Sequence, residues 1–372
     1  ILARQHYENI IKFLDDGPFQ DVRVVLLSSS LKKAEREQLL AQIAAGEAQL
    51  VVGTHALITG DVVFKTLSFV VIDEQHKFGV RQRALLSEKG RNPDVLIMTA
   101  TPIPRTLCIT LYGDLDVSII NEIPPGRGKV ETLPFSHEEA DKAYDLVRRR
   151  ILEGRQAYVV YPIIEESETL DLKAAQEMFR KFKTTLFKDK RVALVHGKMK
   201  PAESEAIMRD FKAGKIDLLV ATTVLEVGVD VANATVMVIE HADRFGLAQM
   251  HQLRGRIGRG EHDGLCLLVT DPKTQDGQKR IQAICSTTDG FKIAQHDLEI
   301  RGPGKYFGRH QHGLNELKVA NPATQLDILE LARKEAQTLT KADPLLTKSQ
   351  HRDIRRVISR RYPTYLAMVA AG

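Results

Sequence analysis

"AEREQLLAQIAAGEAQLVVGT", residues Ala34–Thr54, decides the fold because the chain uses the same pattern twice. It recurs as "AESEAIMRDFKAGKIDLLVAT" (Ala202–Thr222), and the two stretches align over 21 residues without a gap at an offset of 168. Each joins a helix, a glycine that ends it and a buried strand, a combination that many α/β proteins contain. An ungapped match of this length favours a duplication. We therefore predict two similar α/β domains in tandem.

Short apolar runs, rich in β-branched residues, alternate along the chain with stretches that have a helical period. Runs that stay apolar throughout are typical of strands buried on both faces, as in a parallel sheet. Two predicted helices have clear ends, with Gly46 after Lys32–Ala45 and Gly214 after Glu203–Ala213. The predicted strands are Val22–Leu27, Gln49–Val52, Phe69–Ile72, Val95–Met98, Ala157–Tyr161, Val192–Val195, Asp217–Ala221, Val236–Glu240 and Leu265–Val269.

Two changes in this pattern predict the domain boundaries. The stretch "NEIPPGRGK" (Asn121–Lys129) sets two prolines beside two glycines, which breaks regular structure. After "TDP" (Thr270–Pro272) the alternation stops, and the rest predicts helices with one glycine-rich loop at Arg301–Gly313. We therefore predict a first α/β domain at 1–123, a second at 124–272 and a mostly helical region at 273–372.

The composition of the 372 residues is that of a globular protein, with 43% hydrophobic and 27% charged residues. No apolar run approaches the roughly 18–20 residues of a membrane span, so we expect no membrane contact. The three cysteines lie far apart without the spacing of a metal site, which suits a reducing cytoplasm.

The formal net charge of +5 is concentrated near the end of the chain. Lys341–Gly372 carries seven Lys and Arg residues against two Asp, which accounts for all of it. A basic tail can contact the phosphates of nucleic acid, and it is as often a solvated end. The charge leaves both interpretations open.

Two carboxylates, Asp73 and Glu74, directly follow the predicted strand Phe69–Ile72. Open α/β sheets bind ligands at this end of their strands. A carboxylate there can hold Mg²⁺, and its neighbour can accept a proton from an attacking water. A carboxylate pair that only stabilises a helix N-terminus explains the same residues nearly as well.

The stretch "HQLRGRIGRG" (His251–Gly260) sets Arg256 and Arg259 among three glycines, and the two arginines share one face if the stretch is helical. Guanidinium groups held in this way suit a phosphate clamp, whereas a plain basic surface helix has no need of the glycines. Carboxylates in the first domain and arginines in the second are the parts of a nucleoside triphosphatase with an arginine finger. The sequence therefore predicts a nucleotide site shared by the two domains.

Two further loops follow predicted strands. "MTATPIPRT" holds Thr99 and Thr101, whose hydroxyls suit a hydrogen-bond relay; a turn fixed by its two prolines is the equal alternative. "VLEVGVDV" holds Gly228 and Asp230, and a glycine lets a ligand approach the backbone closely.

In this order and spacing, the motifs "DEQH", "TATPIPRT", "TTVLEVGVDV" and "QLRGRIGRG" resemble motifs II, III, V and VI of superfamily 2 helicases. "ILARQHY" and "VVGTHALI" resemble motifs Ia and Ib, and "VYPIIEESE" and "LVHGKMKPAE" resemble the motif IV region. "DLEIRGPGKYFGRHQHGL" (Asp297–Leu314) resembles the translocation motif of RecG-type ATP-dependent DNA helicases. The resemblance covers nearly the whole chain.

This resemblance implies an enzyme that remodels stalled forks and branched DNA junctions in recombination and repair, with ATP and Mg²⁺ as cofactors. It implies two tandem RecA-like motor domains, the first truncated, followed by the helical region. It also implies a nucleoid-associated monomer of the bacterial cytoplasm, with branched or forked DNA and single-strand binding protein as partners.

The same resemblance assigns roles to individual residues. Asp73 is expected to coordinate Mg²⁺ and Glu74 to activate the hydrolytic water, while Arg259 is the arginine finger, with Arg256 beside it and Gln252 in support. Outside such motifs, a single histidine is more often a structural hydrogen-bonding group than a ligand. The other assignments are nucleotide contact by Gly228 and Asp230, coupling of the nucleotide site to DNA by His76, Thr99, Thr101, Arg301 and Gln311, and contact with the DNA backbone by Thr54, His55, His196, Gly197 and Thr222.

Two alternatives stay open. The transcription–repair coupling factor, a double-stranded DNA translocase, shares much of this motor. Its translocation loop typically reads Arg-Gly-Ala-Gly and Gln-Ser-Gly, where this chain has "RGPG" (Arg301–Gly304) and "QHG" (Gln311–Gly313), which favours the RecG type. The other alternative is a non-enzymatic DNA-binding module without a phosphate loop.

The phosphate loop G-x-x-x-x-G-K-[ST], which cradles the nucleotide in such motors, does not occur in the chain. In the family it precedes motif Ia, so we expect it upstream of Ile1, with the branch-recognising wedge domain further upstream. We interpret the chain as the C-terminal part of a RecG-type protein, and expect it to hydrolyse almost no ATP by itself.

Overall fold

The computed structural model describes residues 2–28, 31–74, 89–90, 93–100, 116–120, 122, 126–162, 168–222, 231–301 and 326–361. The chain divides into two compact units. One comprises Ile1–Pro102 and Ile123–Ile293, and the other Ile103–Glu122 and Ala294–Gly372. In the described part of the chain, no helix combines the length and the apolar character that a membrane crossing requires.

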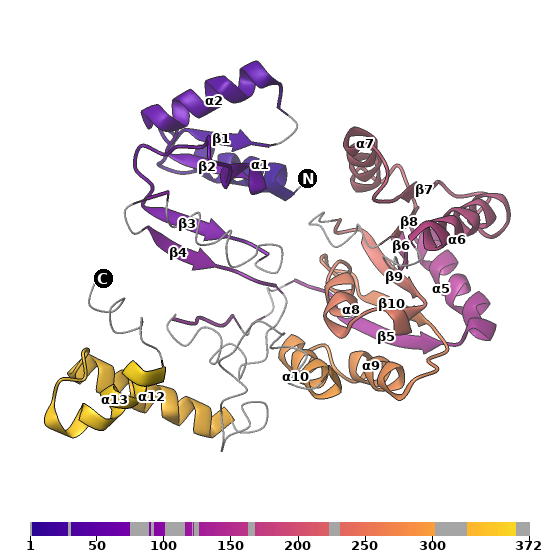
Figure 1. The fold of residues 1–372 in the computed structure, drawn as a ribbon. Helices are drawn as coiled ribbons and strands as arrows, with labels where there is room; N and C mark the ends of the chain where they lie inside the picture. The colour runs from indigo at the N-terminus through magenta and orange to yellow at the C-terminus, as the bar shows by residue number, and fades with distance from the viewer. Residues whose placement is uncertain are drawn as a thin grey trace. The chain divides into compact units, whose positions relative to one another are not determined.

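A six-stranded sheet forms the centre of residues 126–301, and all its neighbouring strands are parallel (Figure 1). The carboxyl ends of all six strands therefore lie at one edge of the sheet. Every residue of the three central strands β6, β8 and β9 is buried, as expected for strands covered on both faces. The strands, in sheet order, are β5 (Val130–Phe135), β10 (Gly264–Val269), β9 (Ala234–Glu240), β6 (Gln156–Tyr161), β8 (Leu218–Thr222) and β7 (Val192–Val195).

Helices pack on both faces of this sheet. On one face, alternate residues of β6 such as Val159 join Val147 and Ala175 of two helices in a continuous apolar core. On the other, Tyr158 packs against Phe211 with ring centroids 4.9 Å apart. The helices are α5 (Ala140–Leu152), α6 (Glu168–Lys181), α7 (Pro201–Lys212), α8 (Leu247–Arg254) and α9 (Gln275–Ser286), with a π-helical turn at Phe182–Leu186 and 3-10 turns at His137–Glu139 and Ala242–Arg244.

The first hundred residues contain two parallel strand pairs, β1 with β2 and β3 with β4. The helix α1 packs against β1 and β2. The elements here are α1 (Leu2–Asp15), β1 (Val24–Leu27), α2 (Lys33–Ala45), β2 (Leu50–Gly53), a 3-10 turn at His55–Leu57, β3 (Phe69–Ile72) and β4 (Asp94–Ile97). The helical region contains α10 (Gly290–Arg301), α12 (Leu326–Ala342), a 3-10 turn at Ser349–His351 and α13 (Arg352–Arg361). The predicted fold class, tandem α/β motor domains followed by helices, is confirmed.

The sequence repeat is also a repeat of backbone geometry. The helix-ending glycines Gly46 and Gly214 have left-handed φ angles of 74° and 73°. The register of β1 on β2 pairs Val24 with Leu50, and that of β7 on β8 pairs Val192 with Leu218, again 168 residues later. The side chains of Gln49 and Asp217 occupy equivalent positions, accepting the N–H of Arg23 (2.9 Å) and of Arg191 (2.8 Å) respectively. The repeated unit therefore begins at Arg23 and Arg191, earlier than the sequence match.

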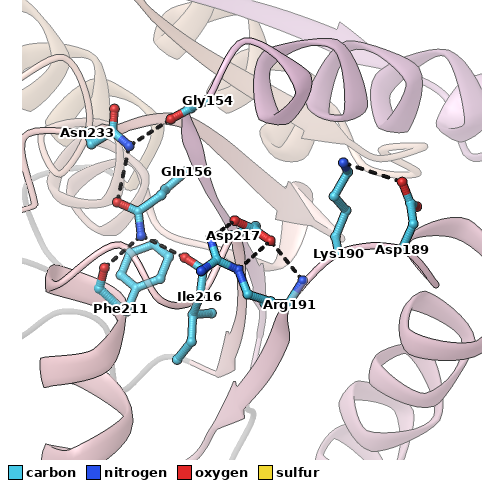
Figure 2. A network of polar contacts seen from close by, with 9 residues as sticks. All are labelled: Gly154, Gln156, Asp189, Lys190, Arg191, Phe211, Ile216, Asp217 and Asn233. Carbon is cyan, nitrogen blue, oxygen red and sulfur yellow. Dashed lines mark hydrogen bonds and ion pairs between the residues drawn. The ribbon is translucent and has the colours of Figure 1, made fainter.

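At the amino-terminal edge of the six-stranded sheet, side chains bind backbone carbonyls of the segments that lead into the strands (Figure 2). The Gln156 amide donates to the carbonyls of Phe211 (2.6 Å) and Ile216 (2.7 Å). The Asn233 amide donates to the carbonyl of Gly154 (3.0 Å) and to Oε1 of Gln156 (3.4 Å). Gln156 is only 4% exposed, so its amide replaces water as the partner of these groups.

An ion pair between Arg191 and Asp217 lies at the same edge, just before β7 and β8. Arg191 donates from Nε (3.1 Å) and from Nη2 (2.5 Å) to the two oxygens of Asp217, as Figure 2 shows. Partial burial alone would raise the pKa of Asp217, but the hydrogen bonds from Arg191 outweigh it and hold the pKa of this carboxyl below its ordinary value. The pair therefore contributes stability at neutral pH, which is lost as the pH falls through the lowered pKa.

All nine predicted strands are present, each within two residues of its predicted ends. β5 was not predicted, because its sequence "VETLPF" lacks a continuous apolar run. The reason is its position: β5 lies at one edge of the sheet, where Pro134 removes no hydrogen bond that an inner strand would need. The domain boundaries at 123 and 272 stay a prediction.

We predict that Gln156→Leu lowers the free energy of unfolding by about 1–3 kcal/mol, because it removes the side-chain donor to the carbonyl of Ile216 and one of the two donors to that of Phe211. Urea titration of the chain, followed by circular dichroism, measures the effect. The control is Gln278→Leu, at an exposed position of α9, which should leave the midpoint nearly unchanged. Equal midpoints for the two variants would contradict the role given to the Gln156 amide.

Candidate nucleotide site and nucleic-acid-facing edge

Asp73 and Glu74 lie at the carboxyl end of β3, both half-buried. Asp73 accepts the N–H of Glu74 at its Oδ1 (2.8 Å). Glu74 has a φ of 52°, in the left-handed region that costs a non-glycine residue about 1 kcal/mol. Backbone strain of this kind is concentrated at functional sites, which supports a role for the pair beyond stabilising a helix end.

The second oxygen of Asp73 faces α1, where Nε2 of His6 lies 3.3 Å from Oδ2. The Asp73 side chain is 35% exposed, so the carboxylate is accessible to a ligand. No group of three or more His, Cys, Asp or Glu side chains that could hold a metal lies within the described residues. One carboxylate is nevertheless a fitting donor set for Mg²⁺, which takes oxygen ligands and usually receives most of them from phosphates and water.

Thr99 lies close to the carboxylates along the strand edge. β4 ends at Ile97, and the N–H of Met98 donates to the carbonyl of Ile72 (2.8 Å), which continues the pairing of the two strands. Thr99 therefore follows β4 at the level where Glu74 follows β3, and it is exposed. The structure thus brings residues of the predicted motifs II and III to one edge of the β3–β4 pair.

The two candidate arginines lie in a tight turn beyond the end of a helix. α8 ends at Arg254, so Arg256 and Arg259 do not share a helical face. Gly258 has a left-handed φ of 65°, and a Cβ there would lie 2.7 Å from Cγ2 of Val130 at the start of β5. Gly258 therefore allows this turn to pack closely against the start of β5. This packing explains the glycine without a bound phosphate.

A single carbonyl holds the turn together. The oxygen of Gly255 accepts a hydrogen bond from Nε of Arg259 (3.0 Å) and another from Nη2 of Arg127 (3.0 Å). The backbone N–H of Gly128 donates to the carbonyl of Gly260 (2.9 Å), tying the far side of the turn to the chain before β5. The Arg259 guanidinium is therefore oriented before any ligand arrives, which is what transition-state stabilisation by an arginine requires.

Beneath the turn, the buried Arg254 anchors α8 to the end of α9. Its Nη1 donates to the carbonyls of Ile284 (2.7 Å) and Thr287 (2.8 Å), and its Nη2 lies 3.1 Å from Nδ1 of His251. A guanidinium has only donors, so Nδ1 of His251 is the acceptor and the ring proton is on Nε2. Arg254 thus supplies the last carbonyls of a helix with a charged donor, a favourable arrangement for the helix dipole.

Burial, together with the positive charges of Arg254 and Arg127, lowers the pKa of His251 to about 4. The imidazole is therefore neutral at physiological pH, as its acceptor role requires. Gln252, the neighbour on α8 that the sequence assigned to nucleotide support, is half-buried.

The candidate DNA contacts follow the carboxyl ends of strands in both α/β parts. Thr54 and His55 come directly after β2 and are exposed. Thr222 ends β8 and is fully buried, while His196 and Gly197 follow β7, the neighbouring strand. Thr54 and Thr222 are equivalent in the repeat, so the two sets have this one position in common.

Arg301, the candidate coupling residue in the translocation motif, is the last residue of α10. Its Nε donates to Oδ1 of Asp297 (3.0 Å), one helical turn earlier, and that carboxylate is buried. The remaining candidates, Gly228, Asp230, His76, Thr101 and Gln311, lie outside the described residues.

Sequence reasoning assigned no role to His6, Arg127, His251 or Arg254. A signal for Arg254 was present, because α8 is apolar at Leu247 and Leu253 and position 254 falls on the same buried face. A charged residue at a position where the helical period demands an apolar one indicates a buried, fully paired guanidinium. The contact of His6 with Asp73 joins residues 67 positions apart and leaves no local signal.

Three family models match the chain in succession. A DEAD/DEAH box helicase model matches residues 1–108, and a helicase conserved C-terminal domain model matches residues 139–261. The model for the C-terminal part of domain 3 of the ATP-dependent DNA helicase RecG matches residues 287–360.

Curated relatives agree with this order of domains. ATP-dependent DNA helicase RecG of Bacillus subtilis is 47% identical over 356 residues, and that of Streptococcus pneumoniae is 50% identical over 340 residues. This chain belongs to the RecG family of superfamily 2 helicases. The alignments cover 95% and 91% of this chain but 52% and 50% of those two proteins, so the chain spans about half the length of these RecG relatives.

Solved structures of RecG and of other helicases share the fold. A structure of RecG bound to a three-way DNA junction is 42% identical, with a TM-score of 0.67 over 88% of this chain and 42% of that one. The helicase MrfA bound to DNA is 18% identical, with a TM-score of 0.56 over 80% of this chain and 47% of that one, and shows the fold alone.

We predict that two glycines of the arginine turn tolerate alanine very differently. Gly258→Ala places a Cβ at a left-handed φ and against Val130, and should lower the free energy of unfolding by roughly 2 kcal/mol. Gly255→Ala, at a φ of −66°, should change it by no more than about 0.5 kcal/mol. Urea titrations of both variants test the pair, and the same loss in both would refute the packing role of Gly258.

We predict that His251 makes the fold sensitive to mild acid. The unfolded chain binds a proton here below its ordinary pKa of 6.5, and the folded chain only below about 4. Stability is therefore lost as the pH falls from 6.5 towards 4, by at most about 1.4 kcal/mol per pH unit. We measure the urea midpoint of unfolding as a function of pH. His251→Gln, whose amide oxygen can still accept from Arg254, should flatten this curve between pH 6.5 and 4. The control His262→Gln, at an exposed position, should leave the slope as it is.

Proposed function

We propose that the protein carrying this chain is an ATP-dependent DNA helicase and translocase that remodels stalled forks and branched junctions in recombination and repair. The match of residues 287–360 to the RecG-specific domain is the observation that carries the proposal, because the other two models are common to many helicases. The relative solved with a three-way DNA junction supports the choice of substrate.

In this proposal ATP binds at the carboxyl edge that carries Asp73 and Glu74. Asp73 holds the Mg²⁺ of the nucleotide, an ion that neutralises phosphate charge. Glu74 accepts a proton from the attacking water, a role that its left-handed backbone supports by turning it out of the strand direction. Gly228 and Asp230 contact the nucleotide from the second domain.

Arg259 acts as the arginine finger, with Arg256 beside it and Gln252 in support. The hydrogen bond from Arg259 to Gly255 supports this role, because a guanidinium fixed in advance loses little freedom when it stabilises the transition state. Arg254, just before the same turn, binds the carbonyls of Ile284 and Thr287 at the end of α9, which joins the turn to the segment that leads into α10.

DNA is contacted through its phosphates by two sets of residues that share the repeat position of Thr54 and Thr222: Thr54 and His55 in the first α/β domain, and His196, Gly197 and Thr222 in the second. Such contacts position a duplex without reading its sequence, which suits an enzyme that acts on structure. Coupling between hydrolysis and DNA movement runs through the motif II, motif III and translocation-motif residues His76, Thr99, Thr101, Arg301 and Gln311.

The proposal extends to a monomer that works in the bacterial cytoplasm on nucleoid DNA, with single-strand binding protein as a partner. A transcription–repair coupling translocase is the second candidate for the motor, and the sequence of the translocation loop, "RGPG" with "QHG", favours the RecG type. The non-enzymatic alternative predicts no DNA-stimulated ATP hydrolysis by the full-length protein.

We predict that Arg259→Ala lowers the DNA-stimulated ATP turnover of the full-length protein by roughly 10³-fold or more, because it removes the finger. Glu74→Gln should lower turnover by about 10²- to 10⁴-fold while nucleotide binding persists, because only the proton acceptor is lost. Turnover is measured with a three-way junction, and binding with a fluorescent ATP analogue.

Matched controls are Arg180→Ala and Glu177→Gln, at exposed positions of α6 outside every candidate motif. They should keep wild-type turnover. Unchanged turnover in Arg259→Ala would make this arginine structural, and no DNA-stimulated turnover in the wild type would favour the non-enzymatic module.

A further inference from the structure

The functional assignments leave the basic end of the chain without a role. The whole formal net charge of +5 is carried by Lys341–Gly372, and the structure folds the middle of this segment into α13 (Arg352–Arg361). Five of the ten residues of α13 are arginine and one, Asp353, is acidic. A random solvated tail has no reason to be a helix, so the arrangement of these charges is informative.

Three of the five arginines of α13 lie in one row. Arg352, Arg356 and Arg360 follow one another at intervals of four residues, so they form a single row along the helix, and all three are exposed. Arg355 is exposed beside this row. The row runs over eight residues, about 12 Å of helix.

The opposite face of α13 is apolar and carries Ile354, Val357 and Ile358. Ile354 is 41% and Val357 57% exposed, so the side chains of the described region cover this face only in part. α13 contains no Phe, Tyr, Trp or Leu. It therefore lacks the aromatic groups on which single-stranded bases stack, and the large apolar anchors of helices that lie in a membrane surface.

Few of these positive charges are neutralised within the protein. Arg356 forms an ion pair with Asp353 (3.0 Å), but both side chains are about 80% exposed, and such pairs stabilise a protein very little. For Arg352, Arg355 and Arg360 the described part of the chain contains no ion-pair partner. Five guanidinium groups thus belong to one short helix with a single carboxylate, an arrangement that costs stability and favours binding of a polyanion.

A buried carboxylate fixes the start of α13. Asp343, directly after α12 and 5% exposed, accepts the backbone N–H groups of Thr347 (2.9 Å) and Lys348 (2.9 Å) and lies 2.8 Å from Nδ1 of His351. His351 immediately precedes α13. The arginine row is therefore presented from an anchored helix, which limits the side-chain and backbone entropy lost on binding.

We propose that the α13 arginine row, Arg352, Arg356 and Arg360, is a further DNA-binding site that grips the phosphate backbone of a duplex arm. Arginine suits this role because its planar fork binds phosphate oxygens in a bidentate manner. The choice of duplex over single strand follows from the absence of stacking groups on the helix. The inference rests on the proposed function, because it adds a contact for the same DNA.

The test compares the full-length protein with its triple variant Arg352→Gln, Arg356→Gln and Arg360→Gln. The control removes three exposed positive charges elsewhere, in Arg149→Gln, Arg180→Gln and Lys188→Gln. Binding to a blunt duplex and to a three-way junction is measured by fluorescence anisotropy over a series of salt concentrations. ATP turnover is measured against DNA concentration.

The α13 variant should bind both DNAs about 10- to 100-fold more weakly at low salt. Its plot of log affinity against log salt should be less steep by up to about 2.7, because each lost phosphate contact removes about 0.9 from the slope. Its turnover at saturating DNA should equal that of the wild type, with only the DNA concentration for half-maximal turnover raised. The control variant should change the affinity by less than about threefold and the slope by less than about one unit.

The triple lysine variant of the same positions keeps the charge but not the planar fork, so its salt slope should stay near that of the wild type and its affinity should lie between those of the wild type and the glutamine variant. An α13 glutamine variant with wild-type affinity and slope, in a protein whose turnover depends on DNA, would overturn the inference and leave the proposed function intact. The inference would also fall if the lysine variant lost as much affinity as the glutamine variant, or if the row bound anionic vesicles and left DNA binding unchanged. A wild type without DNA-dependent turnover would contradict the proposed function itself.

Discussion

The six-stranded parallel sheet is buried on both faces, so the backbone groups where its strands begin and end need hydrogen-bond partners. How these partners are supplied differs between its two edges. At the amino-terminal edge the chain supplies the partners itself, through the Gln156 and Asn233 amides and the Arg191–Asp217 pair. At the opposite edge of the same sheet lie Thr222, His196 and Gly197, and in the first hundred residues the corresponding ends of β2, β3 and β4 carry every described candidate of motifs Ib, II and III.

In the arginine turn, glycine and valine residues that take no part in catalysis set the position of the two candidate guanidinium groups. Gly258 is a glycine because Val130 lies where its Cβ would be, and Gly128 binds Gly260 through the backbone. The start of β5, an edge strand, therefore sets the position of Arg256 and Arg259. Arg254 joins the same turn to the end of α9. Its guanidinium is structural, although it lies close in sequence to Arg256 and Arg259, which we assign to catalysis.

Much of the fold could be predicted because burial leaves a direct record in sequence. The inner strands are continuous apolar runs, and the glycines that end α2 and α7 sit where the backbone turns left-handed. β5 escaped prediction because an edge strand needs neither a continuous apolar run nor a full set of N–H groups. The motifs located the candidate site residues, but the left-handed Glu74, the His6–Asp73 contact and the neutral state of His251 depend on neighbours distant in sequence. No local pattern encodes such neighbours.

The repeated unit also records a divergence in electrical character. In the first copy the N–H of Arg23 binds the amide of Gln49, and in the second the N–H of Arg191 binds the carboxylate of Asp217. An amide neither titrates nor attracts counterions, whereas a carboxylate paired with a guanidinium does both. Both arginines also form an ion pair, Arg23 with Glu47 (3.5 Å) and Arg191 with Asp217 (2.5 Å), but only in the second copy does the same carboxylate bind the backbone N–H as well. The backbone contact that opens the repeated unit can therefore lose its acceptor charge in acid in the second copy, whereas the equivalent contact in the first copy has no charge to lose.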